Sequence, residues 1–304
     1  MANPTSVASK NFFQKIYGEQ HIMGLPRLGS LASVEAMTIE DCQSYFKKLV
    51  PQKLTIHLVG NIDQESAMNA LGIFEDLKGE DFSMPSYDVP DNINAGKIFF
   101  IDIPGSKQSV LFGGKLLMSG NDPNLIKVDY ANEILGGGGS GRLFQVLRID
   151  KGYTYGAYSF INEFKVPSPF IVYSSVRANA TLKSMEIIRD MIQDYGSGFT
   201  EADVETTKTK ILKTNTRAYE SLGSKLDILR NVSKYNRPLN YPEIDQQKLL
   251  DMSLEDYKSI IANNLQEEEL FYIIVGDKAT QLQEIKKLGK PVVEIDLNGE
   301  LIGE

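Results

Sequence analysis

The chain has 304 residues, of which 42% are hydrophobic and 24% charged, enough for one large domain or two ordinary ones. Its formal net charge of -8 argues against a nucleic-acid partner, because neutralising phosphates requires clustered Lys and Arg. No apolar run approaches the roughly 20 residues of a membrane-spanning helix, and the first residues lack the pattern of a signal peptide. The composition is typical of a soluble globular protein and leaves periplasm and cytoplasm both open.

Metal ligands and nucleophiles are sparse. Cys42 is the single cysteine, which excludes an intrachain disulfide and a thiolate cluster. The two histidines, His21 and His57, lie far apart and without clustered ligands, whereas zinc sites draw on grouped His, Cys and carboxylates. His57 falls in a predicted strand, where a histidine packed within a sheet is favoured over a ligand. The sequence therefore predicts no metal site in this chain.

The first third of the chain alternates helical patterns with one strand. The predicted elements are a helix over 10–18 ending at Gly18, a helix opened by Thr38 as N-cap, a strand over 54–59 and a helix over about 64–77. Residues 79–96 then show no period and contain two prolines. The linker between two units is placed there, at 86–96.

The rest of the chain predicts a sheet with helices. Its elements are strands over 97–103 and about 108–117, a helix over 124–135, a hairpin of 153–161 with 170–176 turning at 166–169, three or four helices within 181–263 and a strand over 270–276. The central stretch, Leu135–Phe160, holds five glycines between Gly136 and Gly141, then a helical segment closed by Gly152 and a tyrosine-rich strand. It could form the rim of a binding cleft. Alternatively, the glycines permit close packing and a tight turn.

The end of the chain repeats its beginning. The segment Met37–Asp41 and the later strand Leu54–Gly60 recur as Met252–Asp256 and Leu270–Gly276, at offsets of 215 and 216 residues. This order predicts a tail of a first unit at 1–85, the linker, and a complete second unit at 97–304. We expect the chain to be a fragment or half-enzyme that lacks more than about 100 residues of the first unit.

The expected fold follows from these elements. It is α+β, a two-layer sandwich in which helices cover one face of a mostly antiparallel sheet over 97–296. The arrangement is expected in duplicated units, of which the first is incomplete.

These features resemble the pitrilysin/insulinase family of zinc metallopeptidases, which includes the mitochondrial processing peptidase and the core proteins of the cytochrome bc1 complex. The most specific match is Leu135-Gly-Gly, then Gly-Arg-Leu-Phe-Gln-Val-Leu-Arg148, then Gly152-Tyr-Thr-Tyr155. It is similar to a pattern of that family's second, inactive-type domain. The family's zinc motif, H-x-x-E-H, belongs to the first domain and is absent here.

The resemblance implies a function and partners. The chain would be the C-terminal, substrate-enclosing half of a zinc metalloendopeptidase acting on peptides, with the zinc ligands upstream of this chain. An upstream catalytic domain or a zinc-carrying partner subunit would supply catalysis, and the chain alone is expected to be inactive. The alternative is a structural or assembly subunit like the respiratory core proteins.

The resemblance also implies site residues. Arg148 and Tyr155 match an Arg and a Tyr that reach the substrate in the family, and both can donate hydrogen bonds to a peptide carbonyl and to its developing oxyanion. The alternative is that Arg148 pairs with a neighbouring acid while Tyr155 packs on the sheet. Gly137 and Gly138 are similar to the substrate-handling glycine loop of the processing peptidase's non-catalytic subunit. The run also satisfies G-x-G-x-x-G, but a helix precedes it, which argues against a nucleotide site.

Overall fold

The computed structural model describes residues 3–48, 50–77, 79, 83, 85–88 and 91–302. The chain forms two compact units. We call the first the sheet unit (Met1–Leu25, Val89–Ile211 and Glu243–Glu304) and the second the helical unit (Pro26–Asp88 and Leu212–Pro242). Residues 89 and 90 of the predicted linker lie outside the described part of the chain.

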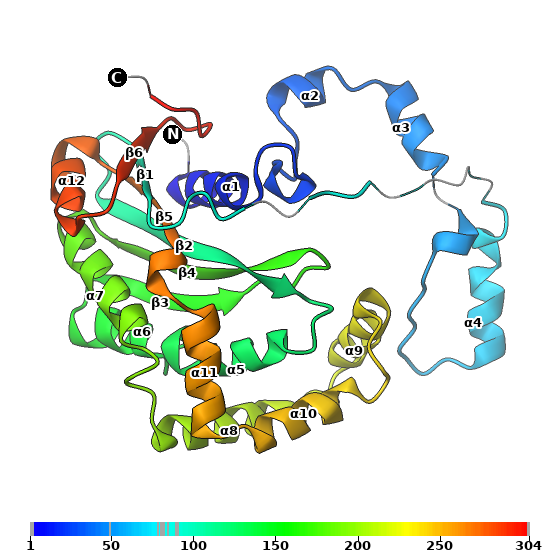
Figure 1. The fold of residues 1–304 in the computed structure, drawn as a ribbon. Helices are drawn as coiled ribbons and strands as arrows, with labels where there is room; N and C mark the ends of the chain where they lie inside the picture. Colours follow the sequence, from blue (N-terminus) through cyan, green and yellow to red (C-terminus); the bar gives the residue numbers. More distant parts are fainter. Residues whose placement is uncertain are drawn as a thin grey trace. The chain divides into compact units, whose positions relative to one another are not determined.

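The sheet unit is built on six strands in the order β3-β4-β2-β5-β1-β6 (Figure 1). They are β1 (Ile98–Asp102), β2 (Gln108–Ser119), β3 (Thr154–Ile161), β4 (Pro167–Arg177), β5 (Phe271–Gly276) and β6 (Val292–Ile295). β1 runs parallel to β5 and β6, and the other three pairings are antiparallel. The predicted α+β class with a mostly antiparallel sheet is confirmed. The predicted turn at 166–169 is wrong, because β4 already begins at Pro167 and pairs there with β2.

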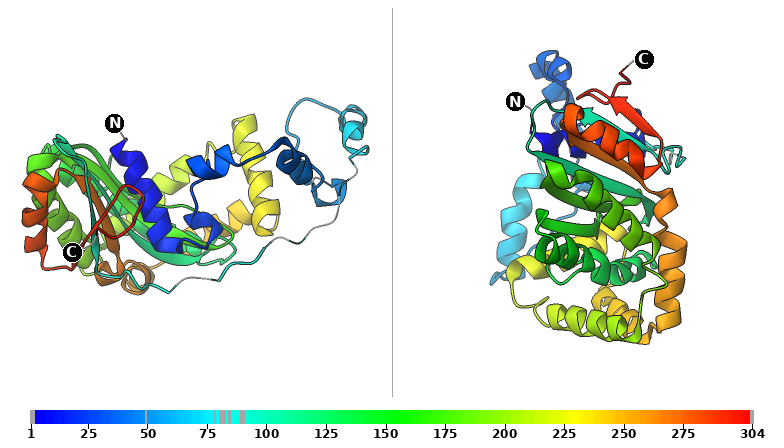
Figure 2. Two further views of the ribbon diagram at one scale, coloured as in Figure 1. Left: turned by 90° about the horizontal axis from the view of Figure 1, so that it is seen from above. Right: turned by 90° about the vertical axis from the view of Figure 1, so that its left-hand side faces the viewer.

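Helices cover one face of this sheet, as predicted. α5 (Leu125–Gly136), α7 (Thr181–Gln193) and α12 (Lys278–Ile285) pack on the strands, and α11 (Leu254–Asn264) packs on α5 (Figure 2). The shorter elements of this unit are α6 (Arg142–Phe144), the π-helical turn η4 (Gln145–Asp150) and the 3-10 turns η1 (Ile22–Gly24), η5 (Ala178–Ala180), η6 (Glu267–Glu269) and η7 (Lys286–Leu288). α8 (Glu201–Asn215) begins in the sheet unit and ends in the helical unit, and α10 (Tyr241–Asp251) does the reverse. None of the described helices is long and apolar enough to cross a membrane.

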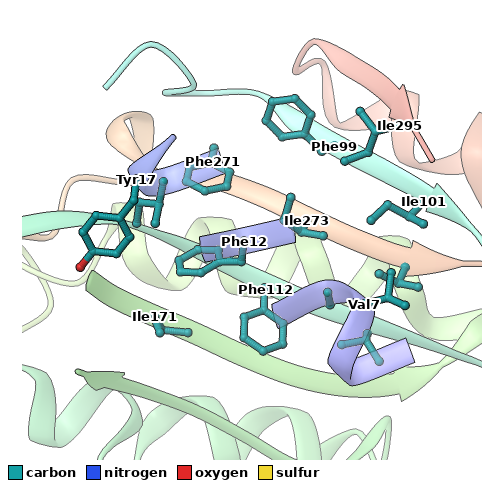
Figure 3. Close-up of a cluster of buried hydrophobic side chains, with 14 residues drawn as sticks. Val7, Phe12, Tyr17, Phe99, Ile101, Phe112, Ile171, Phe271, Ile273 and Ile295 are labelled. Carbon is teal, nitrogen blue, oxygen red and sulfur yellow. The ribbon is translucent and has the colours of Figure 1, made fainter. Parts of the chain in front are cut away.

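The opposite face of the sheet is covered by α1 (Pro4–Tyr17), a helix that the sequence pattern had assigned to the first unit. Its N-cap is Asn3 and it ends at Gly18, whose φ of 83° is a glycine conformation. Phe12 is fully buried and stacks on Phe271 of β5 with ring centroids 5.2 Å apart (Figure 3). Successive side chains of a strand point to opposite faces of the sheet. β5 is buried at every position, which requires helices on both faces.

The helical unit contains α2 (Leu31–Glu35), α3 (Ile39–Phe46), α4 (Gln64–Leu71), α9 (Leu222–Tyr235) and the 3-10 turns η2 (Pro51–Lys53) and η3 (Gly72–Phe74). The predicted strand over 54–59 is wrong: no described residue pairs with it, and Leu54, Ile56 and Leu58 are exposed. An extended segment becomes a strand only when a neighbour shares its backbone hydrogen bonds.

The internal repeat is visible in the capping of its helices. Thr38 and Asp41 form a reciprocal capping box at the start of α3, and Ser253 and Asp256 form the same box at the start of α11. These hydrogen bonds lower the pKa of both aspartates. In the second copy the strand that follows is β5, central in the sheet, whereas in the first copy it is the unpaired segment over 54–59.

Candidate functional site

The glycine run begins where α5 presses against β3. A Cβ on Gly136 would overlap the backbone nitrogen of Ser159 and lie 2.9 Å from its Cα. The contact is fastened by Asn132, whose Nδ2 donates to the Ser159 carbonyl at 2.9 Å while its Oδ1 accepts from the Ser159 hydroxyl at 2.5 Å. Only glycine allows this approach, so the packing alternative holds at Gly136.

The loop after α5 is held by a lysine from α8. Lys210 Nζ donates to the Gly137 carbonyl at 2.7 Å and to Ser140 Oγ at 2.8 Å, and it pairs with the Glu133 carboxylate. A side chain at position 137 would overlap that carboxylate, and Gly138 has a φ of 98°. The two predicted site glycines therefore lie in a turn with its own structural reasons for glycine.

The segment after the loop is a wider helix than the sequence pattern predicts. α6 runs into η4, in which Lys151 N–H donates to the Val146 carbonyl five residues back at 3.0 Å. Leu143 and Leu147 are fully buried under it. Such π-helical turns are rare and occur frequently at functional sites.

Arg148 and Tyr155, the two predicted donors, lie together. The Arg148 guanidinium carbon is 4.9 Å from the centroid of the Tyr155 ring, and its Nη1 donates to the Thr154 carbonyl at 3.3 Å. Tyr155 is 81% exposed and the described partners of Arg148 are a ring and a carbonyl, so the alternative in which Arg148 pairs with a neighbouring acid while Tyr155 packs on the sheet does not hold. A cation–π contact of this kind contributes about 0.5–1 kcal/mol at an exposed position.

A bulge in β3 turns Tyr155 outward. The pairing with β4 shifts register between Thr154 and Ala157, and Thr154 Oγ1 fills the gap by donating to the Ser175 carbonyl at 2.6 Å and accepting from Gly156 N–H at 3.1 Å. Bulges of this kind redirect side chains next to binding sites. The buried threonine thus determines where the exposed tyrosine points.

Acidic groups dominate the outer side of α5. Protein atoms crowded around its carboxyl group, together with the charges of Glu133 and Glu163, raise the pKa of Asp129 to about 6, although the residue as a whole is exposed to solvent. Glu133 is neutralised by Lys210. The outer side of α5 therefore combines one ion pair with a carboxyl group whose pKa is raised.

Zinc does not fit the side chains of this chain that the structure describes. They contain no group of three or more His, Cys, Asp or Glu able to hold a metal ion. His21 is buried against Tyr17, which lowers its pKa, and its Nδ1 accepts from Met23 N–H at 3.0 Å. His57 lies outside any strand, contrary to the prediction, and its Nε2 is 2.7 Å from Ser233 Oγ, while Cys42 is exposed.

The sequence pattern did not point to Gln145 or Lys210. Gln145 Nε2 donates to the Gly139 carbonyl at 2.6 Å, and Lys210 reaches a carbonyl 73 positions away. A polar residue on a helix carries no local signal of such a partner. The π-helical turn could not be predicted either, because its apolar residues have the same spacing as those of an ordinary α-helix.

Comparison with known proteins gives a consistent result. The family model described as the peptidase M16 inactive domain matches residues 36–211, more than half of the chain. Curated relatives include a non-peptidase homolog of Helicobacter pylori, 23% identical over 83% of this chain and 58% of its own length. An uncharacterized zinc protease of Mycobacterium leprae is 24% identical over 68% of this chain and 47% of its own length. The chain thus spans about half the length of the curated relatives it matches.

Solved structures share the fold. The peptidase M16 inactive domain from Pseudomonas fluorescens superposes with a TM-score of 0.81 at 23% identity, covering 90% of this chain and 66% of that one. A chain of complex III2 from Candida albicans superposes with a TM-score of 0.71 at 12% identity, covering 94% and 70%. At such identities the likeness concerns the fold alone.

Proposed function

Because this chain belongs to the peptidase M16 family, through its inactive domain, we propose that it is the substrate-enclosing, non-catalytic half of a zinc-dependent peptidase. The proposal divides the chain into a tail of a catalytic-type unit at 1–85, a linker at 86–96 and the inactive-type unit at 97–304, with α1 packed on the latter. The names of relatives called zinc proteases support zinc in the complete protein. Its ligands would belong to an upstream domain or a partner subunit.

The observation that carries the proposal is the pair of Arg148 and Tyr155. Stacking on the ring restricts the guanidinium to one side of the exposed tyrosine, so that a charged donor and a phenolic donor stand together. A peptide carbonyl placed beside them can accept from both, and the same donors would stabilise negative charge developing on its oxygen. Gly137 and Gly138 lie in the loop that precedes the helical segment carrying Arg148 and are proposed as secondary substrate contacts.

The test is peptide turnover by the complete protein, with its zinc-carrying half restored. Removing one preorganised donor to an oxyanion costs about 10²–10³ in kcat, so we expect Arg148→Ala to fall in that range and Tyr155→Phe to lose about tenfold or more. Arg177 lies over Tyr153 at 6.0 Å and provides a matched control of the same chemistry. If Arg148→Ala and Tyr155→Phe turn over peptide like Arg177→Ala and Tyr153→Phe, the proposal fails.

A structural or assembly subunit is the second candidate. It is favoured by the non-peptidase relative of Helicobacter pylori and by the shared fold with a complex III2 chain. Zinc content decides between the two: a complete protein that binds no zinc and cleaves no peptide after exhaustive reconstitution would be a subunit of this second kind.

A further inference from the structure

A lysine distant in sequence is joined to the proposed site by a chain of hydrogen bonds. Lys210 contacts the glycine loop at both ends of its turn, at the Gly137 carbonyl and at Ser140 Oγ. The middle of that turn, the Gly139 carbonyl, accepts from Gln145 Nε2 at 2.6 Å. Gln145 is the first residue of η4, the π-helical turn that carries Arg148.

The tip of the loop is restrained locally by its own backbone: Gly138 N–H donates to the Gly136 carbonyl at 2.8 Å, and Gly141 N–H donates to the Gly138 carbonyl at 3.0 Å. No heavy atom from elsewhere in the described protein lies within 4 Å of a Cβ built on Gly138 or Gly139. Because no neighbour packs on Gly138 and Gly139, the course of the loop between its ends depends on these backbone hydrogen bonds and on the side-chain contacts from Lys210 and Gln145. Glycine offers the widest choice of backbone conformations, so each of these contacts removes a large amount of freedom.

The contact between Lys210 and the loop is supported by an ion pair and by the glycine at position 137. Glu133 lies one turn before the loop and neutralises the Lys210 ammonium. The Glu133 carboxylate has room there because Gly137 has no side chain. The Lys210 side chain is 36% exposed and the Glu133 side chain 21% exposed. A charge-assisted hydrogen bond in such surroundings is stronger than a neutral one.

We propose that Lys210 is a positioning residue of the site: it shapes the glycine loop and, through Gln145, places the Arg148 guanidinium over Tyr155. The role of Arg148 in this inference rests on the proposed function, whereas the contacts that join Lys210, the loop and Gln145 do not depend on it. Lys210 sits one residue before α8 passes from the sheet unit into the helical unit. A displacement of that helix would therefore be transmitted to the arginine.

The test reads Arg148 directly by NMR, using the whole chain labelled with ¹⁵N-arginine. The Arg148 Nε–H resonance is assigned by its loss in Arg148→Lys, and Tyr155→Leu gives its position without the ring current. We expect Lys210→Met and, independently, Gln145→Leu to move this resonance at least half of the way to the Tyr155→Leu position. Lys210→Arg, which keeps the charge, should restore most of the shift.

Two controls separate positioning from general loosening. Lys208, on the same helix, donates to the Leu250 carbonyl at 2.9 Å, so Lys208→Met should leave the Arg148 resonance unmoved. The Arg177 resonance, over Tyr153, should stay in place in every variant. An Arg148 resonance that keeps its native position in both Lys210→Met and Gln145→Leu overturns the proposal, and if Lys210→Met does not fold, Gln145→Leu alone decides. No peptide is used, so failure here and failure of the turnover test remain distinguishable.

Discussion

Gly136→Ala is the substitution for which the structure gives the sharpest expectation. Its methyl group would overlap the Ser159 backbone, which belongs to a strand and cannot rotate aside as a side chain could. Overpacking of this kind costs about 1–3 kcal/mol. Separating α5 from β3 would also weaken the two hydrogen bonds between Asn132 and Ser159, each contributing about 1 kcal/mol. The sum is roughly 3–5 kcal/mol, a large part of the 5–15 kcal/mol that typically stabilises a domain.

Two other glycines of the same run provide the comparison. Gly138→Ala should cost about 1–2 kcal/mol, because the φ of 98° strains any residue with a Cβ. Gly139→Ala meets nothing within 4 Å at an ordinary φ and should stay within about 0.5 kcal/mol of the native chain. Urea unfolding followed by circular dichroism measures all three, with unchanged m-values as the check on comparability. Equal costs at Gly136 and Gly139 would refute the assigned close approach of α5 to β3.

Three further outcomes are expected. Phe12→Ala should destabilise the chain by about 3–5 kcal/mol, because the Phe12 ring is fully buried on Phe271. Ser6→Ala, on the exposed side of the same helix, should change stability little. Equal melting temperatures of the two variants in calorimetry would contradict the placement of α1. Asp129→Asn should raise the melting temperature at pH 8 and not at pH 4, because a carboxyl whose pKa rises from 3.8 to about 6 on folding costs stability as the pH rises through that window. The gain in the free energy of unfolding should stay under about 1 kcal/mol, since the side chain contacts solvent. A larger gain at pH 4 than at pH 8 would contradict the assigned sign. Ser253→Ala removes the cap of α11 and should cost about 1 kcal/mol by the same melting assay, with Ser253→Thr restoring it; equal stability of the two variants would contradict the cap.

Local patterns were sufficient where an element's partners are near or its signal is strong. The strands β1, β2, β3 and β5, helix α5 and the caps at Thr38 and Ser253 follow from periodicity and capping chemistry, and the structure confirms them. The segment over 54–59 shows where this fails. Its pattern alternates and its place in the repeat corresponds to β5, but a strand forms only as part of a pair, and no partner is present among the described residues.

The site was predictable in its members but not in its geometry. Arg148 and Tyr155 were found through resemblance to a family, since an arginine and a tyrosine seven positions apart carry no physical signal of contact. Their pairing depends on the extra residue in the π-helical turn and on the bulge at Thr154, two one-residue irregularities that leave no periodic trace. Lys210 enters from a helix whose approach to the loop is decided by tertiary packing.

The placement of α1 has a consequence for how the protein is made. Its apolar face packs on β2 and β5, and β5 is synthesised about 250 residues after α1. At about 5–20 residues per second, translation leaves the part of that face that packs on β5 uncovered for roughly 10–50 s. The sheet unit can therefore close only after β5 has left the ribosome. A chain that begins at the linker would lack α1, and the face of its sheet that carries Phe271 would be exposed to water.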